Sequence, residues 1–329
     1  MLLQATNMKL DEKRSSHSPA VSILTPAYNA AEYLDEAVRS ALAQTVEDLE
    51  LIVIDDGSTD DTPAVARRLA EQDGRVRVAA TDHVGVSAAR NIGMRLARGR
   101  VFALLDADDL WHTDFLRVQL SILDAIPDAD VVSGNALSLG GPLDGRPLVT
   151  MSSRCHAVSL LDMIENEHAV CVMSVFRRRV FELTGGFNEE LARGEDYDFW
   201  LRAALHGCGV IRNPEPLARY RRRADSLSAA ELSMLDAMVD VLGRLRRTNQ
   251  LTEPAATAID RRVAVLVERR LWTSAKSNLL RGNYAAASGE FDHLSAMRRS
   301  AASRLVARVS RFAPVVLRVA YQTKLALRV

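Results

Sequence analysis

Between residues 21 and 136, short continuous apolar runs alternate with stretches in which apolar residues recur every three or four positions. The apolar runs predict strands at residues 21–27, 49–56, 76–81, 101–107 and 129–136. The stretches between them predict helices at residues 30–44, 61–72, 86–99 and 113–126. Strands that alternate with helices pair in parallel and are covered on both faces. The pattern therefore predicts an α/β fold with a mostly parallel sheet.

The pattern becomes mixed after residue 136 and nearly all helical after about Ser228. Turn-forming residues predict a loop at 140–147. A buried strand is predicted at 169–176, and a short helix at 195–207. The chain is therefore predicted to have three parts: a disordered N-terminal segment at 1–18, an α/β domain at 19–228 and a helical region at 229–329.

The predicted helical region contains two features of its own. Residues 275–294 predict a helical hairpin that turns at Gly282. Residues 301–329 are amphipathic, interrupted at Pro314, and carry six Arg or Lys and no Asp or Glu. Such a segment fits a helix lying on an anionic membrane surface, and it also fits an ordinary basic helix packed on its domain. The sequence leaves both interpretations open.

Composition excludes some classes of protein and partner. The 42 basic and 42 acidic residues cancel, so net charge gives no argument for nucleic acid. Three cysteines without CxxC spacing favour a reduced, cytoplasmic protein over a disulfide framework or a zinc site. No apolar stretch has the length of a signal-peptide core at the N-terminus or of a transmembrane helix elsewhere. We expect a cytoplasmic protein. A peripheral contact with the inner face of the membrane is compatible with that location.

Acidic residues lie at the ends of two of the predicted strands, where ligands bind in parallel α/β sheets. Asp55 and Asp56 end the second strand, directly after its apolar run LIVI, and come too early to start the helix for which Thr62 and Pro63 supply N-cap and N1 signals. They need solvent or a partner. A ligand role and a solvated role are equally compatible with the sequence.

The fourth predicted strand ends among three acids, Asp106, Asp108 and Asp109. In an extended backbone, residues two apart face the same way at about 6.5 Å, so Asp106 and Asp108 are predicted to share a target. Paired carboxylates suit a hard cation such as Mg²⁺ or Mn²⁺, which takes its other ligands from water and phosphate. Asp109 is expected to point elsewhere, or to cap the helix beginning near Thr113. Spacing alone does not separate a metal site from an ordinary acidic turn.

A third acidic cluster lies at residues 194–198 and includes Glu195 and Asp196. Carboxylates are favourable at a helix N-terminus, so the cluster by itself has a purely structural explanation. Arg90 is compatible with either phosphate binding or a solvated helix face. The sequence has no GxGxxG, GxxxxGK[ST], GxSxG or HExxH motif.

Taken together, these motifs resemble family 2 glycosyltransferases, which have the GT-A fold. The resemblance is carried in order by the stretches SILTPAYNAAEYLDEAVRSALAQT, ELIVIDDGSTDDT, GVSAARNIGMRLARG, FALLDADD and VFRRRVFELTGGFNEELARGEDYDFWLRAALHG. It covers about residues 20–228 and implies a GT-A, Rossmann-like catalytic domain there; the helical C-terminal region lies outside the resemblance. The implied activity is inverting, metal-dependent sugar transfer in bacterial cell-surface polysaccharide or glycolipid synthesis.

The resemblance implies a role for each matching residue. Residues expected to contact the nucleotide sugar are Pro26, Tyr28, Asp56, Arg90, Asp106 and Gly186. Asp106 and Asp108 match the DxD motif, with Asp108 as the direct ligand of Mn²⁺ or Mg²⁺. Asp196 of the ED pair, beside Glu195, matches the catalytic base. The implied donor is a nucleotide-diphosphate sugar, most often of the UDP type, and the acceptor is lipid-linked or a saccharide.

One position departs from the family pattern. Arg223 stands where members often carry His in a Tyr-Arg-x-His run, and Arg cannot ligate a metal. A third protein ligand for the cation is thus in doubt, although Arg could contact a diphosphate. Two other functions remain as alternatives: a nucleotidyltransferase, and a non-catalytic module that binds nucleotide sugars.

Overall fold

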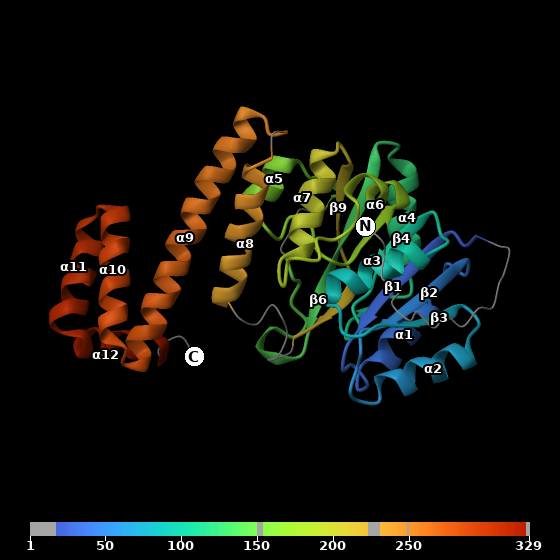
Figure 1. Ribbon diagram of the computed structural model, residues 1–329, viewed down its shortest axis with the longest axis horizontal. Helices are drawn as coiled ribbons and strands as arrows, with labels where there is room; N and C mark the ends of the chain where they lie inside the picture. Colours follow the sequence, from blue (N-terminus) through green and yellow to red (C-terminus); the bar gives the residue numbers. More distant parts are fainter. Residues whose placement is uncertain (1–17, 150–153, 223–230, 249, 327–329) are drawn as a thin grey trace. The chain divides into compact units, whose positions relative to one another are not determined.

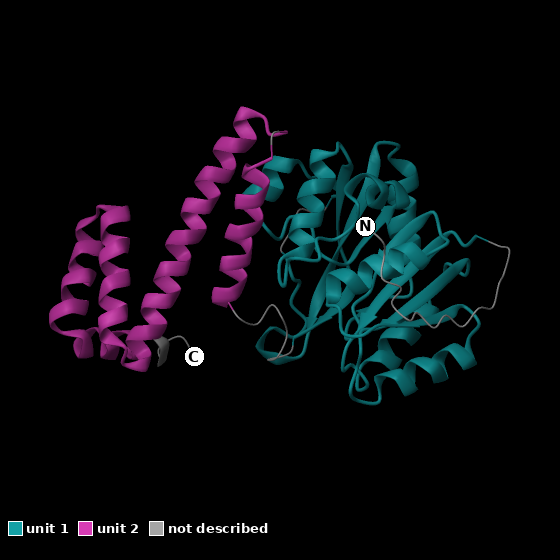
Figure 2. Ribbon diagram, viewed as in Figure 1, with its two compact units in different colours: residues 1–226 teal, residues 227–329 magenta. Residues whose placement is uncertain are grey.

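The computed structural model describes residues 18–149, 154–222, 231–248 and 250–326. The chain divides into two compact units, Met1–Ser226 and Leu227–Val329 (Figure 2). The N-terminal segment for which we predicted disorder lies, except for Ser18, outside the described residues.

Unit 1 is built on a mixed sheet of nine strands in its described part, eight of them in the order β3-β2-β1-β4-β8-β6-β9-β5, with β7 paired to β9 (Figure 1). β1, β2, β3 and β4 are parallel, β6 and β9 pair in parallel, and β5, β7 and β8 pair antiparallel with their neighbours. The strands are β1 (Val21–Ala27), β2 (Leu49–Asp55), β3 (Val76–Ala80), β4 (Val101–Leu104), β5 (Leu110–Trp111), β6 (Ala129–Leu139), β7 (His156–Ala157), β8 (Ser174–Arg177) and β9 (Gly209–Arg221). The predicted mostly parallel α/β sheet is confirmed.

Helices cover both faces of this sheet. Leu34 of α1 packs with Ile23 and Leu51 in one core cluster, whereas Gly93 of α3 lies against Leu24 and Ile54 on the opposite face. Residues adjacent in a strand point to opposite faces, so β1 and β2 are buried at nearly every position. The helices of this unit are α1 (Leu34–Leu42), α2 (Thr62–Gln72), α3 (Val86–Leu96), α4 (Phe115–Ala125), α5 (Leu160–Glu165), α6 (Arg178–Thr184) and α7 (Glu195–Leu205), with a 3₁₀ turn η1 (Gly141–Leu143).

Two strands are shorter in the structure than the sequence predicted. β4 stops at Leu104, because the chain turns there and Asp109 N–H donates to the Asp106 carbonyl. β8 begins only at Ser174, since residues 169–173 form a turn in which Ser174 Oγ donates to the Cys171 carbonyl. Apolar character alone did not distinguish these buried turns from strand.

Unit 2 is helical throughout its described part. It contains α8 (Glu231–Arg246), α9 (Glu253–Arg281), α10 (Tyr284–Arg298), α11 (Ala301–Phe312) and α12 (Pro314–Ala326). Its own core includes Leu279, Phe291 and Ala307. The predicted hairpin is present: Gly282, at φ +86°, closes α9 just before α10 begins. None of the helices described for the chain is both long and apolar enough to cross a membrane.

Candidate active site

The candidate site begins where the parallel strands β1, β2 and β4 end. Tyr28, Asp56 and Asp106 each follow the last residue of one of these strands or lie within two residues of it. Pro26 lies inside β1, paired in register with Ile54 of β2. The carboxyl ends of parallel strands share one edge of the sheet, so the topology places these side chains along a common edge.

Asp56 is buried and holds the loop that follows β3. Its carboxylate accepts hydrogen bonds from Thr81 Oγ1 at 2.6 Å, Val84 N at 2.7 Å and Gly85 N at 2.9 Å. His83 Nδ1 lies 3.1 Å from the Asp56 carbonyl oxygen, and the His83 ring packs on Tyr28 with ring centroids 4.1 Å apart. Asp56 and Tyr28 are thus connected through residues 81–85.

Sequence analysis did not identify His83 or Thr81, although both follow the end of a strand at the same sheet edge. Polar residues after β3 were the available signal, but the segment carries no acid pair or family motif. Tyr28 is half-exposed with one side of its ring against imidazole, an arrangement that leaves an aromatic surface for a flat ligand.

We predicted that Asp106 and Asp108 would lie on one face of an extended strand, and the structure differs. Both lie after the end of β4, in the turn closed by the Asp109 N–H and the Asp106 carbonyl. The side chains of both are partly exposed. The extended-strand argument for their pairing is therefore wrong, and the turn determines where the two carboxylates point.

Asp109 does not cap the following helix. α4 begins at Phe115 with Asp114 at its N-cap, whereas the buried Asp109 carboxylate accepts a hydrogen bond from Arg221 N of β9 at 2.8 Å. Burial, together with the neighbouring charges of Asp106 and Asp108, raises the pKa of Asp109 well above its usual value. Asp109 thus fastens the acidic turn to β9, a connection between residues 112 positions apart.

Arg90 connects the acidic turn to the third acidic cluster. Its guanidinium donates to Asp106 Oδ1 at 2.8 Å and to Glu195 Oε1 at 2.7 Å, and it lies over the Phe187 ring at 5.2 Å. The Arg90 side chain is only 3% exposed, so these two charge-assisted hydrogen bonds are largely shielded from water. Because both terminal nitrogens are engaged by carboxylates, the position of Arg90 is fixed by the two acidic motifs.

Asp196 follows Glu195 in the first turn of α7. Its Oδ1 accepts a hydrogen bond from Tyr197 N at 2.8 Å. Burial is the largest cause, and the charge of Glu195 the next, of a rise in the pKa of Asp196 to about 6, while Arg90 opposes that rise. At neutral pH the carboxylate remains mainly ionised, and a pKa near 6 makes it a better proton acceptor than an unperturbed Asp.

Asn91, the residue after Arg90, was missed by sequence analysis. Its side chain accepts from Phe187 N at 2.8 Å and donates to the Phe187 carbonyl at 2.9 Å and to Glu189 Oε1 at 2.8 Å. Gly186 lies against it at φ +99°, and a Cβ there would come within 2.4 Å of Asn91 Oδ1. α3 thereby positions the segment that contains Gly186.

The acidic turn has the donor chemistry that a hard divalent cation uses. Mg²⁺ and Mn²⁺ are often held by one or two protein carboxylates, with the remaining ligands supplied by water and phosphate. No group of three or more His, Cys, Asp or Glu suited to a metal occurs among the residues that the structure describes. The partly exposed Asp106 and Asp108 are two carboxylates of the kind that such a cation uses. Arg223, at the family's usual His position, lies outside the described ranges.

The structure thus joins Arg90, Asp106 and Glu195 by direct ion pairs, with Asp196 and Asp108 as their sequence neighbours. Tyr28 and Asp56 form a second group, linked through His83. Both groups lie at the edge of the sheet where β1, β2 and β4 end.

The known sequences that this chain resembles include a glycosyltransferase family and individual bacterial enzymes. The family described as glycosyl transferase family 2 matches residues 22–184. The chain is 31% identical over 213 residues to the putative teichuronic acid biosynthesis glycosyltransferase TuaG of Bacillus subtilis, covering 64% of this chain and 82% of TuaG. It is 32% identical over 212 residues to chondroitin synthase of Escherichia coli, covering 60% of this chain but only 28% of that enzyme.

Solved structures with the same fold include two complexes. S. aureus TarS 1-349 with UDP-GlcNAc matches with a TM-score of 0.63 at 18% identity, covering 92% of each chain. The mannosyltransferase PcManGT from Pyrobaculum calidifontis, with GDP-Man and Mn²⁺, matches with a TM-score of 0.60 at 20% identity, covering 96% of this chain and 90% of that one.

Proposed function

This chain belongs to glycosyltransferase family 2, and we propose that it transfers a hexose from a nucleotide diphosphate to an acceptor hydroxyl with inversion at the anomeric carbon. The observation that carries the proposal is the Arg90 bridge, which brings the DxD turn and the ED helix together. The proposed diphosphate site and the proposed base for the acceptor are thereby held near each other by the buried guanidinium of Arg90.

For the donor, we propose a UDP-type sugar. Tyr28 presents a half-exposed ring at the end of β1, and Asp56 lies in the adjoining loop cluster. Gly186 follows α6, and its lack of a side chain allows the backbone there to lie close to Asn91. The UDP-GlcNAc complex of TarS, which has the same fold, supports this choice of nucleotide.

Asp106 and Asp108 would hold the divalent cation, Mn²⁺ or Mg²⁺, with Asp108 as the direct ligand. When bound, such a cation neutralises the charge that develops on the departing diphosphate. PcManGT, a protein of the same fold, was solved with Mn²⁺. Arg90 holds Asp106 Oδ1 in place and leaves the second carboxylate oxygen for other ligands.

Asp196 would act as the base. The acceptor oxygen attacks the anomeric carbon as its proton passes to an Asp196 carboxylate oxygen, while the bond to the diphosphate breaks and its electron pair leaves with the phosphate. A single displacement of this kind inverts the configuration. The positive N-terminal end of α7 helps to keep the carboxylate ionised despite its burial.

We also propose that the acceptor is a lipid-linked or free saccharide and that the enzyme works in the cytoplasm in bacterial surface-polysaccharide or glycolipid synthesis. The likeness to TuaG supports the pathway class. The three free cysteines, Cys155, Cys171 and Cys208, support a reducing compartment.

The decisive experiment is Asp196→Asn. We expect turnover to fall about 100- to 10,000-fold, because general-base catalysis contributes roughly 10²–10⁴-fold. Donor affinity measured by calorimetry should stay within about twofold of wild type. Asp198→Asn, which alters the carboxylate that pairs with Arg202 in the same helix, is the matched control and should retain turnover. Wild-type rates in Asp196→Asn would overturn the base assignment.

The cation site is tested by Asp108→Ala. In wild-type protein, calorimetry should show tighter donor binding with Mn²⁺ than with a chelator, and Asp108→Ala should remove that difference. The control is Asp114→Ala, because Asp114 is the exposed partner of Arg117. A Mn²⁺ effect of unchanged size in Asp108→Ala would contradict the site. Donor binding without turnover on any acceptor in wild-type protein would favour the non-catalytic module instead.

A further inference from the structure

The helix α11 of unit 2 carries two different exposed rows beside its buried face. Ala307 and Ser310 are buried against the rest of the unit, and Ala307 belongs to its core cluster. Arg304, Arg308 and Arg311 are spaced four and three residues apart, which places them along one side of the helix. The packed-helix interpretation is therefore correct for one face of α11, and the arginine row runs along the border of that face, where Arg304, Arg308 and Arg311 remain exposed.

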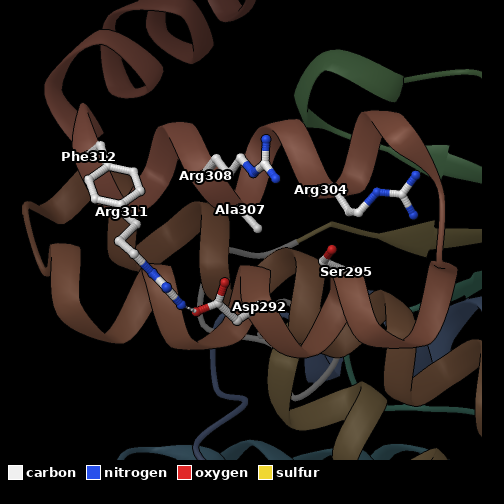
Figure 3. Close-up of a pocket in the computed structure, with 7 residues that line it drawn as sticks. All are labelled: Asp292, Ser295, Arg304, Ala307, Arg308, Arg311 and Phe312. Carbon is white, nitrogen blue, oxygen red and sulfur yellow. Dashed lines mark hydrogen bonds and ion pairs between the residues drawn. The ribbon is translucent and has the colours of Figure 1, made fainter.

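The arginine row borders a groove between α10 and α11. The groove has a volume of about 190 Å³ and is lined by Asp292, Ser295, Arg304, Ala307, Arg308, Arg311 and Phe312 (Figure 3). Arg311 reaches across it to form an ion pair with Asp292. Three cationic side chains against one carboxylate leave the groove positively charged, which complements a phosphate group.

Next to the arginines lie exposed apolar side chains. Among the described large apolar residues, the five most exposed all fall between residues 305 and 319, from 54% for Val319 to 81% for Phe312. The others are Leu305, Val315 and Val316. Exposing such side chains to water is unfavourable, and their concentration in one short stretch marks an interaction surface.

We propose that α11 and the start of α12 dock on an anionic lipid bilayer, with lipid phosphates in the groove at Arg304, Arg308 and Arg311 and with Leu305 and Phe312 inserted among the acyl chains. Residues 301–329 contain six basic and no acidic residues, so charge complementarity favours an anionic surface. Rows of Arg beside large apolar residues are typical of helices that lie in the membrane interface. The proposal does not depend on the sugar-transfer chemistry.

The test is co-sedimentation of the full chain with vesicles of phosphatidylcholine alone or with one-third phosphatidylglycerol. We expect binding only to the phosphatidylglycerol vesicles, with affinity falling as salt rises. Arg304→Gln/Arg308→Gln should weaken it about 30-fold, because each cation near an anionic surface adds roughly a fivefold affinity. Arg269→Gln/Arg270→Gln removes the same charge from exposed positions on α9 and should bind like wild type.

The apolar row is tested separately with two substitutions of Phe312. Phe312→Ser should weaken vesicle binding at least about tenfold, because an inserted aromatic ring is lost. Phe312→Trp should add tryptophan emission that brominated phosphatidylglycerol quenches and free inorganic phosphate does not. Since Phe312 is exposed, neither change removes core packing.

Three results would overturn the proposal. The first is equal binding, or none, on both kinds of vesicle. The second is an equal loss of vesicle binding in Arg269→Gln/Arg270→Gln, which would mean that binding depends on the net charge of the protein and not on this surface. The third is a dimer in vesicle-free solution that Phe312→Ser converts to monomer without any vesicle binding, because the surface would then bind a second copy of the chain.

Discussion

Among single residues, Arg90 connects the two acidic motifs of the proposed site. Its guanidinium donates to both Asp106 and Glu195, which lie far apart in the sequence. Two carboxylates that would otherwise repel are held together by one buried cation. Arg90 is thus a positioning residue for both acidic motifs of the proposed mechanism.

Replacing Arg90 tests this role. Arg90→Met should lower the free energy of unfolding by about 3–5 kcal/mol, because it leaves two partly buried carboxylates without their cation. Arg90→Lys keeps the charge but not the two-pronged geometry, so we expect it to recover part of the stability and little of the turnover. Urea titration and steady-state kinetics measure the two effects. Similar kcat values in wild type and Arg90→Lys would contradict the need for bidentate positioning.

The raised pKa of Asp196 predicts a specific pH profile. The base must be ionised, and its pKa of about 6 means that the active fraction rises with pH through that value and is nearly complete above about pH 7. kcat should therefore fall about tenfold per pH unit well below pH 6. Donor affinity followed by calorimetry over the same range separates this effect from loss of substrate binding. A flat kcat between pH 5 and 7 would be incompatible with Asp196 as the base.

At the scale of elements, α3 organises the segment between α6 and α7. The Asn91 side chain makes two hydrogen bonds to the backbone of Phe187, and Arg202 of α7 donates to the Gly186 carbonyl at 2.8 Å. The segment is held from both sides, although its own sequence predicts only a glycine turn. Its position follows from helices that belong to distant parts of the chain.

The two adjacent glycines allow a matched comparison. Gly185 and Gly186 both have positive φ, at +75° and +99°, but a Cβ on Gly185 meets nothing within 4 Å while one on Gly186 meets Asn91 Oδ1 at 2.4 Å. Gly185→Ala should therefore cost about 1 kcal/mol of stability from backbone strain alone. Gly186→Ala should cost about 2–4 kcal/mol, because the Asn91 contact must also shift. Equal losses in thermal denaturation would mean that the Asn91 contact is unimportant.

At the scale of the whole molecule, each unit has its own hydrophobic core. The unit 1 cluster includes Ile23, Leu51 and Phe115, and the unit 2 cluster includes Leu279 and Phe291. The residues proposed for sugar transfer all lie in unit 1, and the proposed lipid surface lies in unit 2. Chemistry and docking are therefore assigned to separately packed parts of the chain.

Phe291→Ala tests this separation. Removing a fully buried ring should destabilise unit 2 by about 3–5 kcal/mol. Nucleotide-sugar affinity should remain unchanged, because none of the proposed binding residues belongs to that core. Calorimetric scanning of the full chain, followed by donor titration at 25 °C, gives both values. A large loss of donor affinity at a temperature where unit 2 stays folded would contradict the assignment.

Local sequence patterns were enough to predict the alternation of strands and helices, the helical hairpin at Gly282 and the acids at the carboxyl ends of β2 and β4. These features depend on periodicity and on residues close together in the chain, which local pattern captures. The same reasoning failed at the turn after β4, where an apolar run continues past the end of the strand. Burial alone does not tell a strand from a buried turn.

Which acids lie together, and which residues hold them, followed from long-range packing that the sequence pattern did not reveal. Arg90 contacts Glu195 across 105 positions, Asp109 accepts from Arg221 across 112, and Asn91 binds Phe187 across 96. Such contacts depend on how the sheet returns distant segments to one edge, and no local pattern encodes that return. The physical reason is that a buried charge or amide takes its partner from whichever element packing brings near it, whatever the separation in sequence.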